Sequence, residues 1–145
     1  MKFVNQALVG GLAAICNIAI HALVMTAVIR AAQNAGSLRV TRPSVYIAGV
    51  MIAVVSVLMA AHTIEVFVWS LVYAIVGAVP EGSGFVYFAF VNYTTLGYGD
   101  ITPVAHWQLL GPITAMNGIL LFGWSTAVIF EVLRRSLDRA PPAKF

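Results

Sequence analysis

Charged residues are scarce in this chain, and cysteine is almost absent. Only 9% of the 145 residues are Asp, Glu, Lys or Arg, whereas a soluble domain carries roughly a quarter. This shortage excludes a disordered chain, a nucleic-acid-binding domain and an ordinary cytosolic enzyme. The single cysteine, Cys16, excludes a disulfide framework and a cysteine-rich metal site. The length of 145 residues is enough for one domain and too short for two.

Hydrophobic residues make up 61% of the chain and gather in three long runs, at 3–29, 44–79 and 109–133. A bilayer core of roughly 30 Å needs about 20 helical residues, so each run is long enough to cross a membrane. Only Lys2 precedes the first run, which is also longer than the roughly 7–15 residues of a signal-peptide core, so we interpret it as a span. Because a spanning backbone must satisfy its own hydrogen bonds, we predict an all-α membrane protein with three transmembrane helices.

The second run has recognisable ends. Pro43 precedes it, and proline is favoured early in a helix. Gly77 and Pro80 near its end are typical of a helix stop. A single helix over this run would be about 54 Å long. We therefore expect it to tilt, to project beyond the bilayer, or to break.

The basic residues indicate the orientation in the membrane. Seven of the eight lie in two segments, one between the first and second runs and one after the third. With three spans both segments fall on one side, which the positive-inside rule makes cytoplasmic. We therefore expect the N-terminus outside, the C-terminus inside and residues 80–107 outside, an arrangement that explains the pI of 9.4 without nucleic acid. The small size and the absence of a targeting signal fit a prokaryotic inner membrane. These seven residues are Arg30, Arg39, Arg42, Arg134, Arg135, Arg139 and Lys144.

The outward segment contains a short apolar and aromatic run, residues 85–95, after a turn at 80–84. As a helix this run measures roughly 16 Å, too short to cross a bilayer, so we expect it to re-enter the membrane and stop partway. It leads into the stretch Thr94-Thr95-Leu96-Gly97-Tyr98-Gly99-Asp100. Glycine adopts positive φ without steric cost. Alternating backbone handedness along this stretch can therefore turn successive carbonyls toward one side.

This stretch closely resembles the selectivity filter of tetrameric potassium channels, with Leu96 in place of the valine of the familiar motif. The context is similar too, because the motif follows a short helix and precedes a long hydrophobic one. The resemblance covers about residues 85–130, whereas the first run has no counterpart in the minimal two-span members. Trp107 corresponds to an outer-mouth tryptophan and Gly118 to the hinge glycine of the inner helix. Cavity-lining positions correspond to Ile119, Phe122 and Thr126. Apart from the resemblance, we expect Phe130 to narrow the inner end of this helix.

The resemblance implies a homotetramer in the bilayer, in which each chain supplies one strand of the filter. K⁺ is then bound by the backbone carbonyls of Thr95, Leu96, Gly97 and Tyr98, with the Thr95 hydroxyl as the innermost ligand. The C-terminal end of the short helix, which carries partial negative charge, points at the central cavity. Asp100 concentrates cations at the outer mouth, holds the filter by a hydrogen bond, or does both. The predicted filter residues are Thr95, Leu96, Gly97, Tyr98 and Gly99, and the predicted bracing partners of the Tyr98 ring are Tyr87, Phe88 and Tyr93.

One position departs from the family pattern. Some members carry a glutamate on the short helix, paired with the equivalent of Asp100, whereas this chain has Val91. An acid occurs instead in the second run, where Glu65 follows His62 by three residues and so shares its helix face. We expect this pair to lie behind the short helix and to bond Asn92, Tyr93 or Trp69, replacing the brace that is lost at Val91. The plainer alternative is a satisfied pair that joins two helices without affecting ions.

Other polar residues within the runs have simpler interpretations. A metal site at His62 and Glu65 is disfavoured, because two ligands are too few and no further His or Cys is near in sequence. Asn17 and His21 share a face of the first run, and we expect them to contact another helix. Asn117 faces either the cavity or a neighbouring helix. Gly118 and Gly123 either bend the inner helix or allow close helix packing.

The sequence therefore predicts the pore-forming subunit of a potassium-selective channel, with passive K⁺ conduction and no cofactor. The alternative is a non-conducting or accessory channel-like subunit. A regular arginine series is missing, so we expect no voltage sensor of the familiar kind. An enzyme is not expected, since the sequence offers no nucleophile–base pair, metal cluster or phosphate loop. The predicted divisions are residues 1–43 (N-terminal helix and basic loop), 44–137 (pore domain) and 138–145 (short cytoplasmic tail).

Overall fold

The computed structural model describes residues 2–34 and 42–139. Four helices account for most of them: α1 (Lys2–Asn34), α2 (Pro43–Val76), α3 (Phe85–Tyr93) and α4 (Leu110–Arg139). Three of these helices, α1, α2 and α4, are long and apolar enough to cross a membrane. The predicted all-α architecture with three membrane-spanning helices is confirmed. Arg39, Lys144 and the end of the predicted tail from residue 140 lie outside the described residues.

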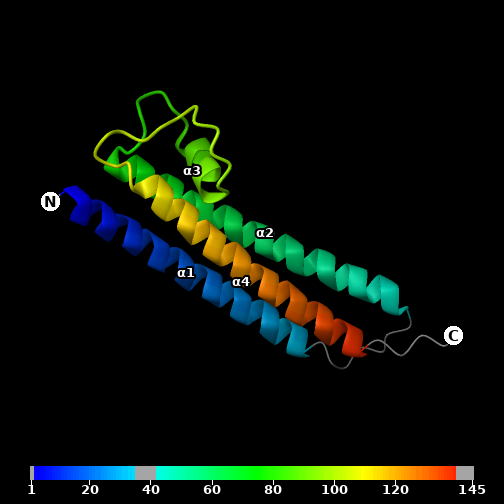
Figure 1. The fold of residues 1–145 in the computed structure, drawn as a ribbon. Coiled ribbons are helices and arrows are strands. Elements are labelled where there is room, and N and C mark those ends of the chain that lie inside the picture. The colour runs from blue at the N-terminus through cyan, green and yellow to red at the C-terminus, as the bar shows by residue number, and fades with distance from the viewer. Residues whose placement is uncertain (1, 35–41, 140–145) are drawn as a thin grey trace.

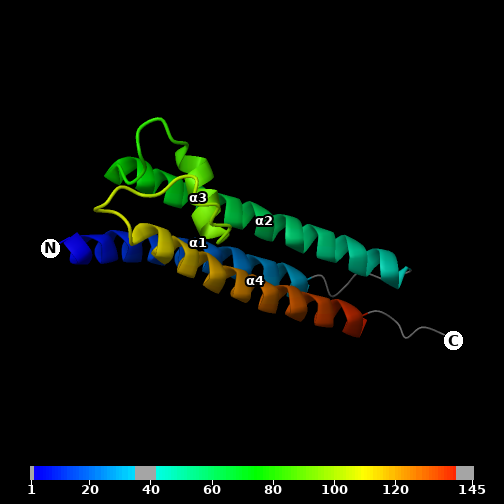
Figure 2. The same ribbon diagram turned by 45° about the horizontal axis from the view of Figure 1, so that its top comes forward.

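The three long helices lie side by side, and α2 runs antiparallel to α1 and α4 (Figure 1). Helix α1 packs against both other long helices, so the extra N-terminal helix is part of the same bundle. Short helix α3 lies at the end of the bundle where α1 begins, and the C-terminal end of α4 lies at the opposite end (Figure 2). The loop that follows α3 therefore occupies one end of the bundle, and the arginines of the helix termini occupy the other.

The ends of α2 follow from its sequence. Pro43 occupies the first turn, where its missing N–H costs nothing. Gly77 ends the helix in the left-handed conformation, with φ 63°, and the N–H of Ala78 then donates to the carbonyl of Tyr73 at 3.0 Å. Between these ends α2 is one unbroken helix. The expectation of a stop at Gly77 is thus confirmed, and the long second run does not break.

Two clusters of buried side chains hold the bundle together. The cluster near α3 is aromatic, with the rings of Tyr73 and Phe88 edge to face at 4.9 Å between centroids. The cluster toward the other end is aliphatic and contains Met25, Leu58 and Val132. Large apolar side chains also cover the outside of the bundle, and Ile52 is 68% exposed. This distribution suits a chain that is surrounded by lipid, because the protein interior and the lipid tails are both apolar environments.

Small residues allow close approach between helices at the α3 end. A Cβ on Gly10 of α1 would lie 2.8 Å from Cδ1 of Ile113 in α4. A Cβ on Gly111 of α4 would lie 2.9 Å from Oδ1 of Asn92 in α3. Near the same end, the side-chain carbonyl of Gln6 accepts a hydrogen bond from the N–H of Leu109 at 2.8 Å. These contacts fix α1 and α3 on the start of α4.

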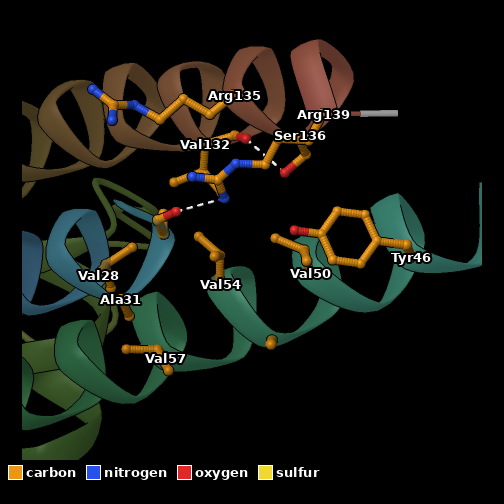
Figure 3. Close-up of a pocket in the computed structure, with 12 residues that line it drawn as sticks. Val28, Ala31, Tyr46, Val50, Val54, Val57, Val132, Arg135, Ser136 and Arg139 are labelled. Atoms are coloured by element: carbon orange, nitrogen blue, oxygen red, sulfur yellow. Dashed lines mark hydrogen bonds between the residues drawn. The ribbon is translucent and has the colours of Figure 1, made fainter. Parts of the chain in front are cut away.

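An arginine ties the opposite end of the bundle together. Arg139 at the end of α4 donates to the carbonyl of Ala32 at 2.6 Å and to that of Gln33 at 3.2 Å. These carbonyls belong to the last turn of α1, where a cation is favourable. Figure 3 shows the Arg139 side chain reaching over a cavity of about 250 Å³ between α1, α2 and α4. The cavity walls are mostly apolar, with Val50 and Val54 among them.

Candidate functional site

Helix α3 positions the loop that carries the filter-like motif. It consists almost wholly of apolar and aromatic residues, and its buried face contains Phe88, Ala89, Val91 and Tyr93. The helix ends at Tyr93, two residues earlier than the run predicted from sequence. The chain then tightens into the loop, since the N–H of Leu96 donates to the carbonyl of Val91 at 2.9 Å. The loop residues therefore start directly from the C-terminal end of a buried helix.

The backbone of this loop alternates in handedness. Thr95, Gly97 and Gly99 have φ values of 60°, 61° and 75°, whereas Leu96 and Tyr98 between them are outside the left-handed region. Positive φ is free for glycine but costly for a β-branched residue, so Thr95 stores strain. Such strain persists only where the surroundings enforce it, and it concentrates at functional sites. The alternation expected from the glycine pattern is present, and it also includes Thr95, two residues before Gly97.

The side chains of the loop are uncovered within one chain. Leu96 is 53% exposed and Tyr98 is 68% exposed. The expected partners of Tyr98 are engaged elsewhere, since Phe88 packs on Tyr73 and the Tyr93 hydroxyl donates to Glu65. The Tyr98 side chain is therefore mostly exposed within one chain, and its bracing by the short helix stays a prediction.

Asp100 has a partner on α3. Its Oδ2 accepts a hydrogen bond from the hydroxyl of Tyr87 at 2.8 Å. This hydrogen bond is the main reason why the pKa of Tyr87 is raised, and slight burial and the negative charge of Asp100 act in the same direction. The contact joins the end of the filter-like loop to the first turn of α3. Of the two roles predicted for Asp100, the structure supplies the geometry for the one that holds the loop.

The residues expected to line the cavity lie on α4. Ile119 is 59% exposed and Phe130 is 67% exposed, and Thr126 is exposed as well. Phe122 differs from them, because its ring packs 4.5 Å from the ring of His62 and 5.4 Å from that of Tyr93, centroid to centroid. Phe122 therefore also supports the interior of the chain.

Gly118 lies where α4 crosses the end of α3. A Cβ at this position would overlap the backbone carbonyl of Tyr93, whereas one at Gly123 would meet nothing within 4 Å. Gly118 is thus required for close packing against the helix that precedes the filter-like loop. Of the two roles foreseen for this glycine, close helix packing is the one that the structure shows.

A polar cluster lies beneath α3, in the middle of the bundle. Glu65 accepts hydrogen bonds at Oε1 from Nδ1 of His21, 2.8 Å away, and at Oε2 from the Tyr93 hydroxyl. Nδ1 of His62 lies 2.9 Å from Oε2 of Glu65. Nε2 of His62 and Nε2 of His21 lie 3.0 and 3.3 Å from the same Ser125 Oγ. Glu65 and His21 are fully buried, and His62 is nearly so. We call His21, His62, Glu65 and Ser125 the buried ring.

The structure decides among the partners expected for Glu65 and His62. Tyr93 is confirmed, since its hydroxyl contacts both side chains. Asn92 is not the partner, because its side chain donates to the carbonyl of Phe88 in its own helix at 2.8 Å. Trp69 is not the partner either, because its Nε1 donates to Oδ1 of Asn117 at 3.1 Å. The pair does lie behind the short helix, as expected.

The comparisons with known proteins add one match. A family described as "Ion channel" matches residues 61–135, which is more than half of the chain. The chain belongs to this ion channel family. No curated protein and no solved structure matches.

The matched segment of this ion channel protein begins in the second half of α2 and ends near the end of α4. It therefore contains α3, the filter-like loop, and three of the residues that support them, His62, Glu65 and Ser125. Helix α1 lies outside the match, although it supplies His21. An ion channel family is not a class of enzymes. The three helices of this chain that are long and apolar enough to cross a membrane, together with the family match, make it an integral membrane protein.

Sequence reasoning missed the contribution of α1 to the buried ring. A metal site was disfavoured partly because no third ligand is near in sequence. The fold nevertheless brings His21, His62 and Glu65 together, with their ligand atoms within 4.8 Å of one another. Asn17, one turn before His21, donates to the carbonyl of Glu65 and to Oδ1 of Asn117, both at 3.2 Å. Asn117 is 3% exposed and therefore faces neighbouring helices rather than a cavity. The only signal in the sequence was the shared face of Asn17 and His21.

Proposed function

We propose that this protein is the pore-forming subunit of a potassium-selective channel, which conducts K⁺ passively as a homotetramer. The permeating ions bind to the backbone carbonyls of Thr95, Leu96, Gly97 and Tyr98, and the Thr95 hydroxyl completes the innermost site. Membership of the ion channel family supports a channel subunit. The potassium selectivity and the tetramer rest on the motif and on its backbone.

The observation that carries the proposal is the alternation of φ at Thr95, Gly97 and Gly99. A strand whose residues alternate in handedness turns successive carbonyl oxygens toward one side. Rings of such carbonyls replace the hydration shell of a permeating ion in potassium channels. An ordinary turn gains nothing from three left-handed residues separated by single residues, one of them a threonine with an energetic penalty.

Exposure within a single chain supports assembly with further copies. Leu96 and Tyr98 lack cover within one chain. Ile119 and Phe130 leave a large apolar face of α4 open, and one strand cannot surround an ion. Four copies around one axis provide four strands, cover the exposed filter side chains, and turn the open face of α4 toward a central cavity.

Electrostatics supports a cation rather than an anion. The C-terminal end of α3 carries a partial negative charge of roughly half an electron, and four such ends stabilise a cation partway across the bilayer. Asp100 adds negative charge at the end of the loop.

The described arginines at the helix ends lie at the opposite end of the bundle, which favours that end as cytoplasmic. We therefore place the filter and the N-terminus outside, in a prokaryotic inner membrane.

The test is cation flux through purified full-length protein reconstituted in liposomes. We expect K⁺ and Rb⁺ to enter along a gradient and Na⁺ to be excluded. Equal flux of K⁺ and Na⁺ would overturn the selectivity, and a monomer in solution would overturn the assembly. If a purified tetramer carries no cation, the accessory subunit is the correct alternative.

A further inference from the structure

We propose that the buried ring is a proton-binding site, which holds one exchangeable proton and controls conduction through Tyr93. This inference rests on the proposed function for its effect on conduction, but not for the binding of the proton. The ring joins α1, α2 and α4 at the depth where α3 ends. Glu65 stands in it between two histidines.

Counting hydrogen atoms shows that the ring needs one additional proton. Among its own four residues it contains four nitrogen–oxygen contacts, two from Nδ1 atoms to Glu65 and two from Nε2 atoms to Ser125. The Tyr93 hydroxyl, 2.9 Å from Nδ1 of His62, supplies its own hydrogen atom to Glu65 and is not included in this count. Each of the four contacts needs one hydrogen atom. Two neutral imidazoles supply two and the serine hydroxyl supplies one, while an ionised carboxylate supplies none. The fourth contact is satisfied only when the ring binds a further proton.

Counting charge leads to the same number. A carboxylate buried in a membrane is costly unless a positive group compensates it. Among the described residues, only histidines lie within ion-pair distance of Glu65. The next arginine along α1 is Arg30, nine residues after His21 and thus about 13 Å further on. One bound proton converts a negative ring into a neutral one.

The donor set also suits a zinc ion chemically, but the spacing favours a proton. Zn²⁺ with bonds of about 2.0–2.1 Å at tetrahedral angles holds its ligand atoms roughly 3.3 Å apart. The two Nδ1 atoms lie only 2.8 and 2.9 Å from the carboxylate oxygens, which are hydrogen-bond distances. A divalent ion would moreover leave a net positive charge in a buried site that has one carboxylate.

Tyr93 is the route from the ring to the filter-like loop. Its hydroxyl donates to Glu65 and lies 2.9 Å from Nδ1 of His62, and its backbone is two residues from the strained Thr95. Tyr93 is the only titratable group of α3 that faces the buried ring. The groups of α4 that contact the buried ring are Ser125 and the aromatic side chains of Phe122 and Trp124, which do not titrate. Loss of the proton leaves an uncompensated charge and one unsatisfied contact beside Tyr93. We therefore expect conduction to fall as the pH rises.

The binding of the proton can be measured without ion flux. The chain has three histidines, of which His21 and His62 belong to the ring and His106 is exposed. In ¹⁵N-histidine NMR spectra of the assembled protein, the exposed His106 lies outside the ring and serves as the internal reference. The ring histidines should together release one proton, and they should stay neutral in Glu65→Gln. Release of two protons, or of none, from the ring histidines of the wild-type protein would overturn the site.

The effect on conduction is tested by K⁺ flux between about pH 5 and 8, the range over which histidine changes charge. We expect a decrease of at least about fivefold, the low end of coupling between sites. His106→Gln is the matched control and should keep this dependence, whereas Glu65→Gln should lose it. Tyr93→Phe should bind the proton but conduct independently of pH, and a pH dependence retained in Tyr93→Phe would overturn the route.

Two further results keep this proposal separate from the proposed function. If the protein carries no K⁺ at any pH, the NMR titration still decides whether the ring binds its proton. Stoichiometric binding of Zn²⁺ that is lost in both His21→Gln and Glu65→Gln would overturn the proton as the ligand. Ser125→Ala, a smaller change than Glu65→Gln, removes both contacts of the Nε2 atoms but keeps the charge of Glu65. The ring should therefore still release one proton in this variant, and loss of that release would overturn the charge argument.

Discussion

The filter-like loop and the buried ring meet at Tyr93 but are built in opposite ways. The loop comes from one continuous stretch of sequence, its side chains are exposed, and it is incomplete in one chain. The ring takes one residue from α1, two from α2 and one from α4, is buried, and is complete within a single chain. The loop therefore depends on backbone conformation and, in the proposed tetramer, on symmetry, whereas the ring depends on the tertiary packing of distant residues. Substitutions in one region should leave the backbone and packing of the other intact, even where they change conduction.

The largest effect should come from the handedness of the loop. Gly99 has φ 75°, and a Cβ at this position would meet nothing within 4 Å, so Gly99→Ala tests the backbone alone. The left-handed region costs alanine roughly 1–2 kcal/mol. In the proposed tetramer four subunits share one filter, so we expect K⁺ flux in liposomes to fall at least about a hundredfold. Gly49→Ala in α2 is the matched control, because its side chain also meets nothing and no positive φ is required. Wild-type flux in Gly99→Ala would show that conduction does not depend on the alternating handedness of the loop backbone.

This contrast explains what the sequence could predict. Three hydrophobic runs fixed the number of spans, because length and hydropathy are local properties. The loop was recognised for the same reason, since Gly97 and Gly99 enforce a backbone pattern that is written in consecutive residues. The ends of α2 followed from Pro43 and Gly77.

The ring could not be predicted, because its members are far apart in sequence. His21 and Ser125 are separated by 104 residues and meet only through helix packing. Periodicity placed Glu65 and His62 on one face but could not tell which of Asn92, Tyr93 and Trp69 would face them. The brace expected for Tyr98 stays a prediction for a different reason. Its side chain is 68% exposed within one chain, and the proposed tetramer would supply the further copies against which it can pack.

The next largest effect should arise where the two regions meet, at Gly118. A side chain there would overlap the backbone carbonyl of Tyr93, so α3 and α4 must separate in Gly118→Ala. Overpacking of this kind costs about 1–3 kcal/mol. We expect a lower midpoint of thermal unfolding in detergent. The matched control is Gly123→Ala in the same helix, which meets nothing and should gain up to about 1 kcal/mol from helix propensity. Equal shifts in the two variants would contradict this account.

A smaller effect is expected at Asn117, which belongs to the interior alone. Its Oδ1 accepts hydrogen bonds from Nδ2 of Asn17 and Nε1 of Trp69. Interhelical hydrogen bonds in membranes contribute about 0.6 kcal/mol on average and up to about 1.7. Asn117→Leu should therefore lower the free energy of unfolding by about 1–2 kcal/mol while the selectivity for K⁺ over Na⁺ stays unchanged. Thr63→Val is the control, because its hydroxyl bonds only to the carbonyl of Met59 in its own helix. A change of selectivity in Asn117→Leu would show that the interior also shapes the loop.

The smallest effect should occur at the outer contact between Tyr87 and Asp100. The hydrogen bond to Asp100 raises the pKa of Tyr87, so the phenol stays neutral to a higher pH than an ordinary tyrosine. The neutral phenol is the donor, so this contact is fully present below a pH of about 10 and is lost only as the pH passes the raised pKa. The difference in phenolate absorbance between the wild-type protein and Tyr87→Phe isolates this group, and Asp100→Asn should move its titration to lower pH. Because Tyr87 is exposed, we expect K⁺ flux in Tyr87→Phe to stay within about twofold of wild type, as surface contacts contribute little. A loss of flux comparable to that of Gly99→Ala would mean that a side chain, and not the backbone alone, holds the loop in its alternating form.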